Sequence, residues 1–313
     1  MNTEYTPRIL VTGANGQIGT VLIKALREKY GADNVISSDL VHSETDGPFE
    51  IINVLDKDRI DSVIQKYQIT DIYHLAALLS SKGEQKIELT WDINLNAYLC
   101  ILNLAVKHKI KKVFFPSTIG VFGHSTPRIN TPQDVPLLPG TVYGISKVTG
   151  ELWSQYYRNK FGLDVRSLRY PGVISYEVIP SGGTTDFAVE IFFDAILKGK
   201  YKCYLKPDTR LPMIYMPDVI KGTLDLMSAK KSNISISYGY NISSFSVSPD
   251  DLYKEISKHI SDFDIEYKPD HRQSIAESWS ETIDDSMARK DWNWTPEYDM
   301  QKMAADMLKN IQT

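Results

Sequence analysis

Hydrophobic and polar positions follow two different rhythms along the first half of the chain. Short apolar runs, of the length of buried strands, precede longer stretches in which apolar residues recur every three or four positions, as on one helix face. The predicted strands are 8–12, 35–38, 71–76, 113–117 and 165–169, and the predicted helices are 17–30, 57–67, 89–108 and 143–160. Strands that alternate with helices in this way predict βαβ units, a parallel sheet and right-handed crossovers.

The second half of the chain has a different pattern. After about Pro171 the alternation gives way to short, irregular segments separated by glycine and proline. We therefore predict an α/β protein with a Rossmann-like, doubly wound parallel sheet at residues 1–171. Residues 172–313 are predicted to form mainly a smaller, substrate-binding lobe, with some segments returning to the first domain.

Composition and charge narrow the class of protein. The 313 residues are 42% hydrophobic, enough for a large core, and the net charge is 35 − 39 = −4. Such a charge gives no electrostatic reason to expect nucleic acid or an anionic membrane as a partner. Neither Cys100 nor Cys203 has metal-ligand spacing, so no metal site is predicted. The chain has no visible signal or transit segment, and no apolar run approaches the roughly 18 residues that a membrane span needs. The expected location is therefore cytoplasmic. A mitochondrial location is the alternative if a transit segment has been removed.

A glycine-rich turn joins the first predicted strand to the first predicted helix. The segment RILVTGANGQIG places Gly13, Gly16 and Gly19 there, in the spacing G-x-x-G-x-x-G. Glycines at these positions allow a tight turn, close approach of the backbone to a pyrophosphate, and amides at the positive end of a helix. Plain turns also use glycine, but the preceding strand and the following helix favour a dinucleotide site.

Two acidic residues follow the next strands. Asp39 ends the second predicted strand, 20 residues after Gly19, where a carboxylate accepts hydrogen bonds from ribose hydroxyls and repels a 2′-phosphate. Leu40 and Val41 come next and offer no cation for such a phosphate, so NAD rather than NADP is the predicted cofactor. Asp56, after the third strand, is predicted either to reach the adenine or to cap a helix, and both readings stay open.

The spacing Y-x-x-x-K occurs three times, and residues four apart lie on one face of a helix. A lysine ammonium beside a tyrosine favours the phenolate, which is a proton acceptor. The three pairs are Tyr143 with Lys147, Tyr156 with Lys160, and Tyr298 with Lys302. Chance explains at least some of these pairs, so their surroundings must identify the functional one.

The pair at 143 and 147 follows a strand end that carries hydroxyl groups. Ser117 and Thr118 end a predicted strand, and ligands on parallel sheets bind outside the carboxyl ends of strands. A proline-rich loop then returns the chain to the same edge before Tyr143. Tyr156 lies further along the same helix, ~20 Å away at the helical rise, and cannot share that site. We therefore predict that Tyr143 and Lys147 are the functional pair.

Together these motifs resemble the extended short-chain dehydrogenase/reductase superfamily over the first 175 residues or so. The resemblance adds HLAA at 74–77 and Asn94, which matches a position on the nicotinamide side, although it could also be a plain polar helix residue. It implies that Thr118 orients the substrate oxygen, that Tyr143 takes its proton, and that Lys147 lowers the pKa of that tyrosine and binds the nicotinamide ribose. The residues predicted to bind the cofactor are Gly13, Asn15, Gly16, Gln17, Ile18, Gly19, Asp39, Asp56, Leu75, Ala76, Ala77, Asn94, Tyr143, Lys147 and Tyr170.

Two departures argue against sugar-nucleotide chemistry, which is common in the superfamily. Dehydratases carry an Asp-Glu pair after the strand-end threonine, where this chain has Ile119 and Gly120. Epimerases read Arg-Tyr-Phe-Asn after the sixth strand, with the asparagine on the diphosphate, whereas this chain reads RYPG at 169–172. A nucleotide-sugar epimerase is therefore the weaker alternative.

Three further segments resemble the L-threonine 3-dehydrogenases of the short-chain type, and the resemblance then spans nearly the whole chain. They are AALLSSKGE (76–84), LRYPGVIS with PSGGTTDFAVEIFFDA (168–175 and 180–195), and SIAESWSETIDDSMARKDWNW (274–294). Ser181 replaces the usual glycine and Ser81 lies where alanine is frequent, which affects local loop geometry only. The residues predicted to bind the substrate are Ser80, Ser81, Ser117, Thr118, Tyr143, Thr184, Thr185 and Trp279.

The resemblance implies a metal-independent enzyme that oxidises the C3 hydroxyl of L-threonine to 2-amino-3-oxobutanoate, with hydride transfer to NAD. Read from the residues alone, the glycine-rich segment is a turn with a helix N-cap and Trp279 is a core residue. A non-catalytic NAD-sensing protein is the other alternative, but it would not need Thr118, Tyr143 and Lys147 together. Homodimers built on two long helices, here 89–108 and 143–160, are common in the superfamily, and we expect one.

Overall fold

The computed structural model describes residues 6–177 and 183–311, without the side chains of residues 81 and 82. The chain divides into two compact units, and neither is a continuous stretch of sequence. Unit 1 comprises Met1–Ser117, Thr141–Leu168 and Thr223–Gly239, and unit 2 comprises Thr118–Gly140, Arg169–Gly222 and Tyr240–Thr313.

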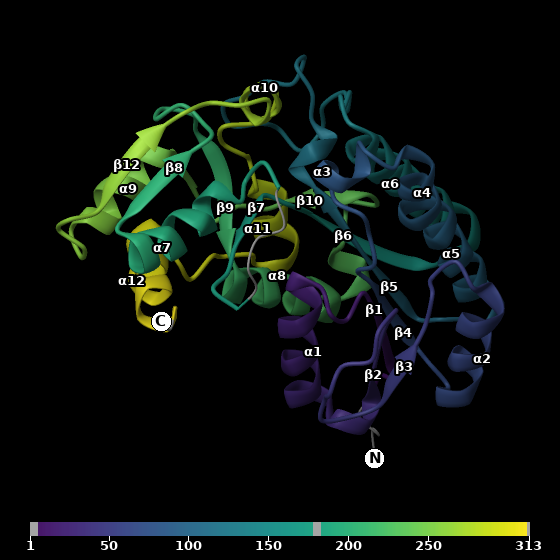
Figure 1. Cartoon of the computed structure of the whole chain (residues 1–313). Helices are drawn as coiled ribbons and strands as arrows, with labels where there is room; N and C mark the ends of the chain where they lie inside the picture. The colour runs from purple at the N-terminus through teal and green to yellow at the C-terminus, as the bar shows by residue number, and fades with distance from the viewer. Residues whose placement is uncertain (1–5, 178–182, 312–313) are drawn as a thin grey trace. The chain divides into compact units, whose positions relative to one another are not determined.

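A seven-stranded sheet, to which unit 1 contributes most residues, confirms the predicted Rossmann-like α/β fold (Figure 1). Its strands are β1 (Ile9–Thr12), β2 (Val35–Asp39), β3 (Phe49–Ile51), β4 (Asp71–His74), β5 (Lys112–Thr118), β6 (Asp164–Tyr170) and β10 (Gly239–Asn241). The strand order is β10-β6-β5-β4-β1-β2-β3, and the pairs β1–β2, β1–β4, β2–β3 and β4–β5 are parallel. Ile9 is in register with Val35 on one side and with Asp71 on the other.

Helices cover both faces of this sheet, with α1 on one face and α2, α4, α5 and α6 along the other (Figure 1). Their bounds are α1 (Gln17–Tyr30), α2 (Lys57–Tyr67), α3 (Ser80–Gly83), α4 (Ile87–Trp91), α5 (Ala97–Lys107) and α6 (Val142–Phe161), with short 3₁₀ turns η1 (Ala32–Asn34) and η4 (Lys231–Asn233). Between the sheet and α2, α5 and α6 lies a cluster of buried apolar side chains that includes Ile72, Val113, Ile101 and Tyr157. Burying each such side chain contributes about 1.5–3 kcal/mol, so this core holds the strand ends in fixed places.

The helix predicted at 89–108 is present, and residues 87–107 are helical without a gap, but it is not α-helical throughout. A π-helical turn, η2 (Asp92–Asn96), separates α4 from α5. The side chain of Asn94, inside this turn, bonds both the backbone N–H and the backbone carbonyl of Leu78. Such local widening is common where a side chain in a helix serves another segment, and hydrophobic periodicity alone does not reveal it.

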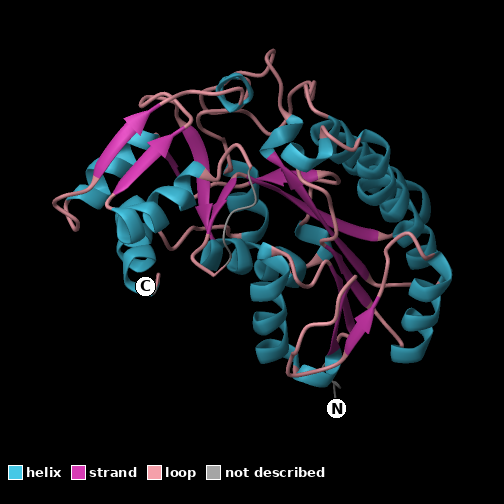
Figure 2. Cartoon of the chain, viewed as in Figure 1, coloured by secondary structure: helices cyan, strands magenta, loops and turns pink. Residues whose placement is uncertain are grey.

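Unit 2 holds two small sheets and several short helices (Figure 2). One sheet has the order β11-β9-β7, from strands β7 (Gly172–Ile174), β9 (Leu211–Tyr215) and β11 (Phe245–Val247), and the other pairs β8 (Lys200–Cys203) with β12 (Asp264–Tyr267). The helices are η3 (Ile119–Val121), α7 (Phe187–Lys198), α9 (Pro249–Ser257), α10 (Arg272–Glu277), α11 (Ser286–Trp292) and α12 (Met300–Asn310), while α8 (Met216–Ser228) runs across the division. Among the described residues, no helix is long and apolar enough to cross a membrane.

Candidate active site

The glycine-rich turn between β1 and α1 is tightly packed and brings the start of a helix to the end of the first strand. Gly13 has φ +72°, and a Cβ added there would lie 2.6 Å from the backbone nitrogen of Ala76. The turn is thus packed directly on the segment after β4. No side chain caps the start of α1 at Gly16, so its first amides are available to an anion. This geometry suits the pyrophosphate of a dinucleotide.

Asp39 is held at the end of β2 beside this turn. One carboxylate oxygen accepts a hydrogen bond from the backbone N–H of Asn15 at 2.9 Å, and the other accepts from Leu40 at 2.7 Å. The Asn15 side chain in turn donates to the carbonyl of Val41 and accepts from the hydroxyl of Ser43. A carboxylate fixed in this way keeps its remaining lone pairs for further donors, as ribose binding requires.

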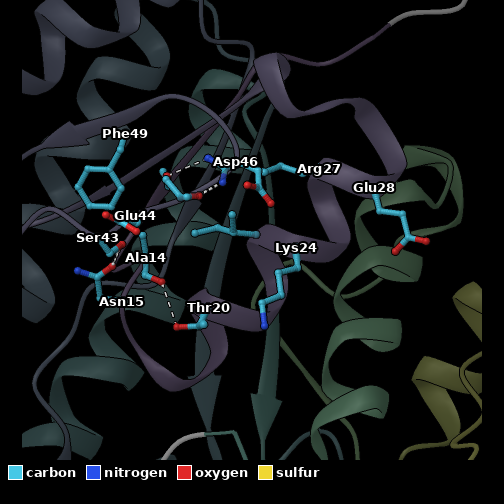
Figure 3. Close-up of a pocket in the computed structure, with 13 residues that line it drawn as sticks. Ala14, Asn15, Thr20, Lys24, Arg27, Glu28, Ser43, Glu44, Asp46 and Phe49 are labelled. Carbon is cyan, nitrogen blue, oxygen red and sulfur yellow. Dashed lines mark hydrogen bonds between the residues drawn. The ribbon is translucent and has the colours of Figure 1, made fainter.

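A pocket of about 920 Å³ lies next to Asn15 (Figure 3). It is lined by α1 and by the loop before β3, and it contains none of the predicted catalytic residues. Arg27 crosses it and donates hydrogen bonds to Ser37 and to the carbonyls of Val35 and Pro48. The guanidinium therefore braces the loop, and the pocket is distinct from the tyrosine–lysine pair.

Two residues predicted to contact the cofactor have structural partners within the chain. Asp56 caps α2, where its carboxylate accepts from the backbone N–H of Arg59 at 3.0 Å. Asn94 is buried, and besides its two bonds to Leu78 it donates to the hydroxyl of Ser146 at 3.2 Å. Asn94 thus ties the segment after β4 to α6. Contacts of these two residues with a nucleotide stay predictions.

The start of α6 places Tyr143 and Lys147 beside the end of β5. Thr141 caps the helix by accepting from the backbone N–H of Gly144 at 3.0 Å. One turn after Tyr143, the Lys147 ammonium donates to the carbonyl of Pro116 at 2.8 Å. The same nitrogen lies 5.7 Å from the centre of the Tyr143 ring and 4.6 Å from that of Phe115. The lysine charge is therefore within reach of the tyrosine.

Burial makes Lys147 an unusual lysine. Its side chain is 3% exposed, and desolvation lowers its pKa to about 7, although Glu151 opposes this shift. His74, at the end of β4, is also buried, and desolvation together with the Lys147 charge lowers its pKa to about 3. His74 is therefore neutral at physiological pH, and burial makes the charged form of Lys147 less favourable than that of an exposed lysine.

Ser117 and Thr118 are adjacent on β5 and point to opposite faces of the sheet. The buried hydroxyl of Ser117 donates to a carboxylate oxygen of Glu151 at 2.5 Å. Thr118 accepts from the backbone N–H of Gly120 at 3.1 Å, which leaves its hydroxyl hydrogen to be donated elsewhere. This difference favours Thr118 as the group that orients a substrate oxygen.

The other two tyrosine–lysine pairs lie in different surroundings. Lys160 donates to the hydroxyl of Tyr156 at 2.8 Å, but Tyr156 is 43% exposed. In unit 2, the Lys302 ammonium lies 4.2 Å from the centre of the Tyr298 ring. Among the three pairs, all within the described ranges, only the one at 143 and 147 has a buried lysine.

Two of the predicted substrate residues of unit 2 are buried, because Thr184 and Trp279 are 4% and 8% exposed. Tyr170, which is predicted to bind the cofactor, is 5% exposed. The hydroxyl of Tyr204 donates to the carbonyl of Gly183 at 3.1 Å and so supports the loop that contains Thr184. Ser80 begins α3, whereas the side chain of Ser81 and residues 178–182, which include Ser181, lie outside the described residues.

Sequence reasoning did not single out Glu151, and it named His74 only as part of the HLAA segment. Both are buried polar residues: Glu151 accepts from Ser117, and the charge of Lys147 adds to the effect of burial in lowering the pKa of His74. A signal for Glu151 was present, because it lies four residues after Lys147 and must share its helix face. Groups of three or more His, Cys, Asp or Glu side chains that could hold a metal are not found among the described residues.

Comparison with known proteins adds to this geometry. Residues 9–242 match the NAD dependent epimerase/dehydratase family. The mitochondrial L-threonine 3-dehydrogenase of Bos taurus is 42% identical over 306 residues, which are 96% of this chain and 82% of that protein. The structure of a GalE-like L-threonine dehydrogenase from Cupriavidus necator, in its holo form, is 45% identical with a TM-score of 0.96, covering 98% of this chain and 100% of that one. A monomeric L-threonine 3-dehydrogenase from a metagenome is 48% identical with a TM-score of 0.94, covering 97% and 98% of the two chains.

Proposed function

The chain belongs to the NAD dependent epimerase/dehydratase family, and from this premise we propose that it oxidises L-threonine with NAD. The C3 hydroxyl becomes a ketone, and the product is 2-amino-3-oxobutanoate. The observation that carries the proposal is the buried ammonium of Lys147, held between the Tyr143 ring and the carbonyl of Pro116. The likeness to proteins named L-threonine dehydrogenases over almost the whole chain supports this choice of substrate.

The residues of unit 1 fit NAD. A side chain at Gly13 would collide with the backbone of Ala76, so glycine there allows the tight turn that brings the start of α1 to the end of β1. The uncapped first amides of α1 are donors for that group, and the Asp39 carboxylate suits the adenosine ribose. When bound, NAD accepts the hydride that leaves C3.

The chain's own residues handle the proton and the orientation of the substrate. Thr118 donates its hydroxyl hydrogen to the C3 oxygen and directs the substrate toward Tyr143. Tyr143, as the phenolate, removes the proton from that oxygen, and a ketone forms as hydride leaves carbon. The ammonium of Lys147 stabilises the phenolate, so that a base with an ordinary pKa near 10 works near neutral pH.

The nucleotide-sugar epimerase is less well supported by this site. Gly172 stands where epimerases have the asparagine that binds the diphosphate. A Cβ there would lie 2.3 Å from the sulfur of Met213 and 2.9 Å from the Thr185 side chain. An asparagine side chain would have to displace both residues, so this space is used by Thr185 instead.

Formation of NADH on mixing the protein with NAD and candidate substrates tests the proposal. L-Threonine should give NADH, while UDP-sugars, L-serine and L-allo-threonine should be oxidised more slowly or not at all. Epimerisation of a UDP-sugar in the absence of threonine oxidation would favour the epimerase. NAD binding without turnover of any hydroxy amino acid would favour the sensor.

We assign the two units separate tasks within this function. Unit 1 would bind NAD and supply Tyr143 and Lys147, and unit 2 would supply Thr184, Thr185 and Trp279 for the amino acid. Exchange of residues 172–222 and 240–313 for the same segments of an epimerase would then change the substrate but leave NAD binding intact. Loss of NAD binding in that chimera would contradict the division of tasks.

We also propose a cytoplasmic homodimer that uses α4 and α6. Exposed apolar side chains gather on these two helices, which contact each other: Ile87, Leu89 and Trp91 on α4, and Ile145, Leu152 and Tyr156 on α6. Exposed patches of this kind often mark interfaces. Leu152→Glu should convert the dimer to a monomer in light scattering, whereas a wild-type protein that is already monomeric, like the metagenomic relative, would contradict the proposal.

A further inference from the structure

The inner face of α6 carries a row of buried polar side chains that the proposed function uses only in part. Ser146, Lys147, Glu151 and Ser154 are each no more than 3% exposed. Glu151 is 1% exposed and lies one helical turn after Lys147. A buried carboxylate is strongly unfavourable unless other groups compensate its charge, so a chain that retains one must gain something from it.

Glu151 is linked to the active site by one hydrogen bond and by the effect of its charge. Its carboxylate accepts the hydroxyl hydrogen of Ser117, the residue before Thr118 on β5. It also raises the pKa of Lys147, against the larger, opposite effect of burial. The first contact fixes the strand end against α6, and the second acts on the charge of the catalytic lysine.

The other titratable groups around Lys147 do not supply such a charge. His74 on β4 shares a hydrogen bond with Thr12 at 2.9 Å through Nδ1, and burial keeps the ring neutral. Tyr98 on α5 is hydrogen-bonded to Ser154 at 2.7 Å. Burial raises the pKa of Tyr98 above the ordinary value of a tyrosine, so this side chain also stays neutral. Glu84, the residue after α3, accepts from the backbone N–H of residue 142 in an exposed position at the start of α6. Glu151 is thus the buried anion of this group.

We propose that Glu151 is a positioning residue, which keeps the proton on Lys147 when the Tyr143–Lys147 pair has lost one, so that Tyr143 becomes the phenolate. The inference rests on the proposed function, because it assigns the base to Tyr143. After the loss of one proton the pair has two forms: phenolate with ammonium, or phenol with neutral amine. Only the first form has a base to accept the proton of the substrate hydroxyl.

Helix geometry explains why Glu151 selects the first form. Along α6, Glu151 is four residues from Lys147 and eight from Tyr143, about 6 Å and 12 Å at the helical rise. Its negative charge therefore stabilises the ammonium more than it disfavours the phenolate. Without that charge, desolvation of Lys147 favours the neutral amine, and the proton returns to Tyr143.

Glu151→Gln separates this role from a structural one, because glutamine keeps the shape and an acceptor for Ser117. Two changes in the pH profile of kcat/KM are expected together. The rising limb should move to lower pH by about one unit. Without the negative charge of Glu151, the fully protonated Tyr143–Lys147 pair, which carries a positive charge, is less stable and loses its first proton more easily. The plateau should fall by roughly 10–100-fold, because the proton now leaves the lysine rather than the tyrosine. A structural defect would lower the plateau and leave the limb in place.

The position of the proton is measured in the apoprotein, without substrate or cofactor. In protein labelled with ¹³C at the tyrosine ring carbon that bears oxygen, Tyr143→Phe identifies the Tyr143 resonance among the 18 tyrosines. In the wild type this resonance should shift to the phenolate position as the pair loses its first proton. In Glu151→Gln it should shift by a much smaller fraction.

Two controls complete the experiment. Glu151→Asp keeps the negative charge, so the rising limb of its kcat/KM profile should stay at the wild-type pH even if the activity of the variant is lower. Glu50→Gln removes another buried carboxylate, which is on the edge strand β3 and bonded by Lys66 and Tyr67. It should lower stability and leave the pH profile unchanged.

Three results would overturn the inference. The first is a Glu151→Gln limb at the wild-type pH, and the second is a Tyr143 resonance that titrates alike in both proteins. The third is a wild-type Tyr143 resonance that does not move through the first step, which is decisive even if Glu151→Gln fails to fold. If threonine is not oxidised at all, the proposed function fails, while the NMR result still decides where the proton lies.

Discussion

The two halves of α6 carry the same four-residue spacing and have different chemistry. Near its start, Lys147 is buried and lies against the Tyr143 ring and the end of β5. Near its end, Lys160 is hydrogen-bonded to the exposed hydroxyl of Tyr156. The pKa values move in opposite directions: burial lowers that of Lys147 to about 7, whereas the Tyr156 hydroxyl raises that of Lys160. The spacing brings two side chains together in both pairs, but only the pair at 143 and 147 lies in the desolvated surroundings that lower the pKa of its lysine.

Removing one oxygen from each tyrosine is the strongest test of this comparison. Tyr143→Phe keeps the packing of the ring and should lower threonine turnover by roughly 10²–10⁴-fold, the usual effect of losing a general base. Folding and NAD binding should survive. Tyr156→Phe, the matched control on the same helix, should change turnover less than about twofold, since surface changes are usually worth under ~0.5 kcal/mol. Steady-state kinetics of the two variants would refute the assignment if Tyr143→Phe turned over threonine at the wild-type rate.

The end of β5 offers a second matched pair. Thr118→Ala should lower kcat/KM by roughly 10²-fold, because the substrate oxygen loses the donor that orients it, and Thr118→Ser should keep much of the activity. Ser117→Ala should instead lower thermal stability, because its hydroxyl is bonded to buried Glu151. Equal turnover by the alanine and serine variants at 118 would transfer the role to Ser117.

A third comparison contrasts two aspartates that follow strands. Asp39→Ala should weaken the binding of NAD by on the order of 1–3 kcal/mol, because the ribose loses a hydrogen bond to a charged group. It should also reduce the preference for NAD over NADP. Asp56→Ala should leave that preference unchanged and lower stability by about 1 kcal/mol, because Asp56 caps α2. Binding titrations with both cofactors check this. A wild-type protein that uses NADP as well as NAD would contradict the role of Asp39.

The sequence predicts these local elements better than it predicts their mutual contacts. The bounds of α1 and α2 follow from periodicity to the residue, since apolar spacing and capping are local properties. The π-helical turn at η2 was missed, because the bonds of Asn94 within it go to Leu78, 16 residues earlier in the chain. The position of Glu151 on the helix face of Lys147 was available from spacing, but its bond to Ser117, 34 residues away, was not. Spacing along the chain identified the catalytic candidates, and tertiary contacts determine which groups tune them.

The smallest expected effect concerns stability, and it compares the two lysines of α6. Burial lowers the pKa of Lys147 to about 7, whereas an unfolded lysine has a value near 10.4. Between these values the Tyr143–Lys147 pair therefore binds fewer protons than the same residues in the unfolded chain, whichever member keeps the remaining proton. The contribution of the pair to stability rises with pH across that window, by at most about 1.4 kcal/mol per pH unit, and is lost as pH falls through 7. Lys147→Met removes this contribution. The melting temperature of the wild-type apoprotein minus that of the variant should therefore increase between pH 7 and 10. The melting temperature of Lys160→Met should change with pH in parallel with that of the wild type over the same interval, because a pKa that is raised in the fold changes stability only above the pKa of the unfolded chain. Parallel curves for wild type and Lys147→Met would mean that the Tyr143–Lys147 pair loses no proton in the fold over this interval, and the difference between the two ends of the helix would then be one of exposure alone.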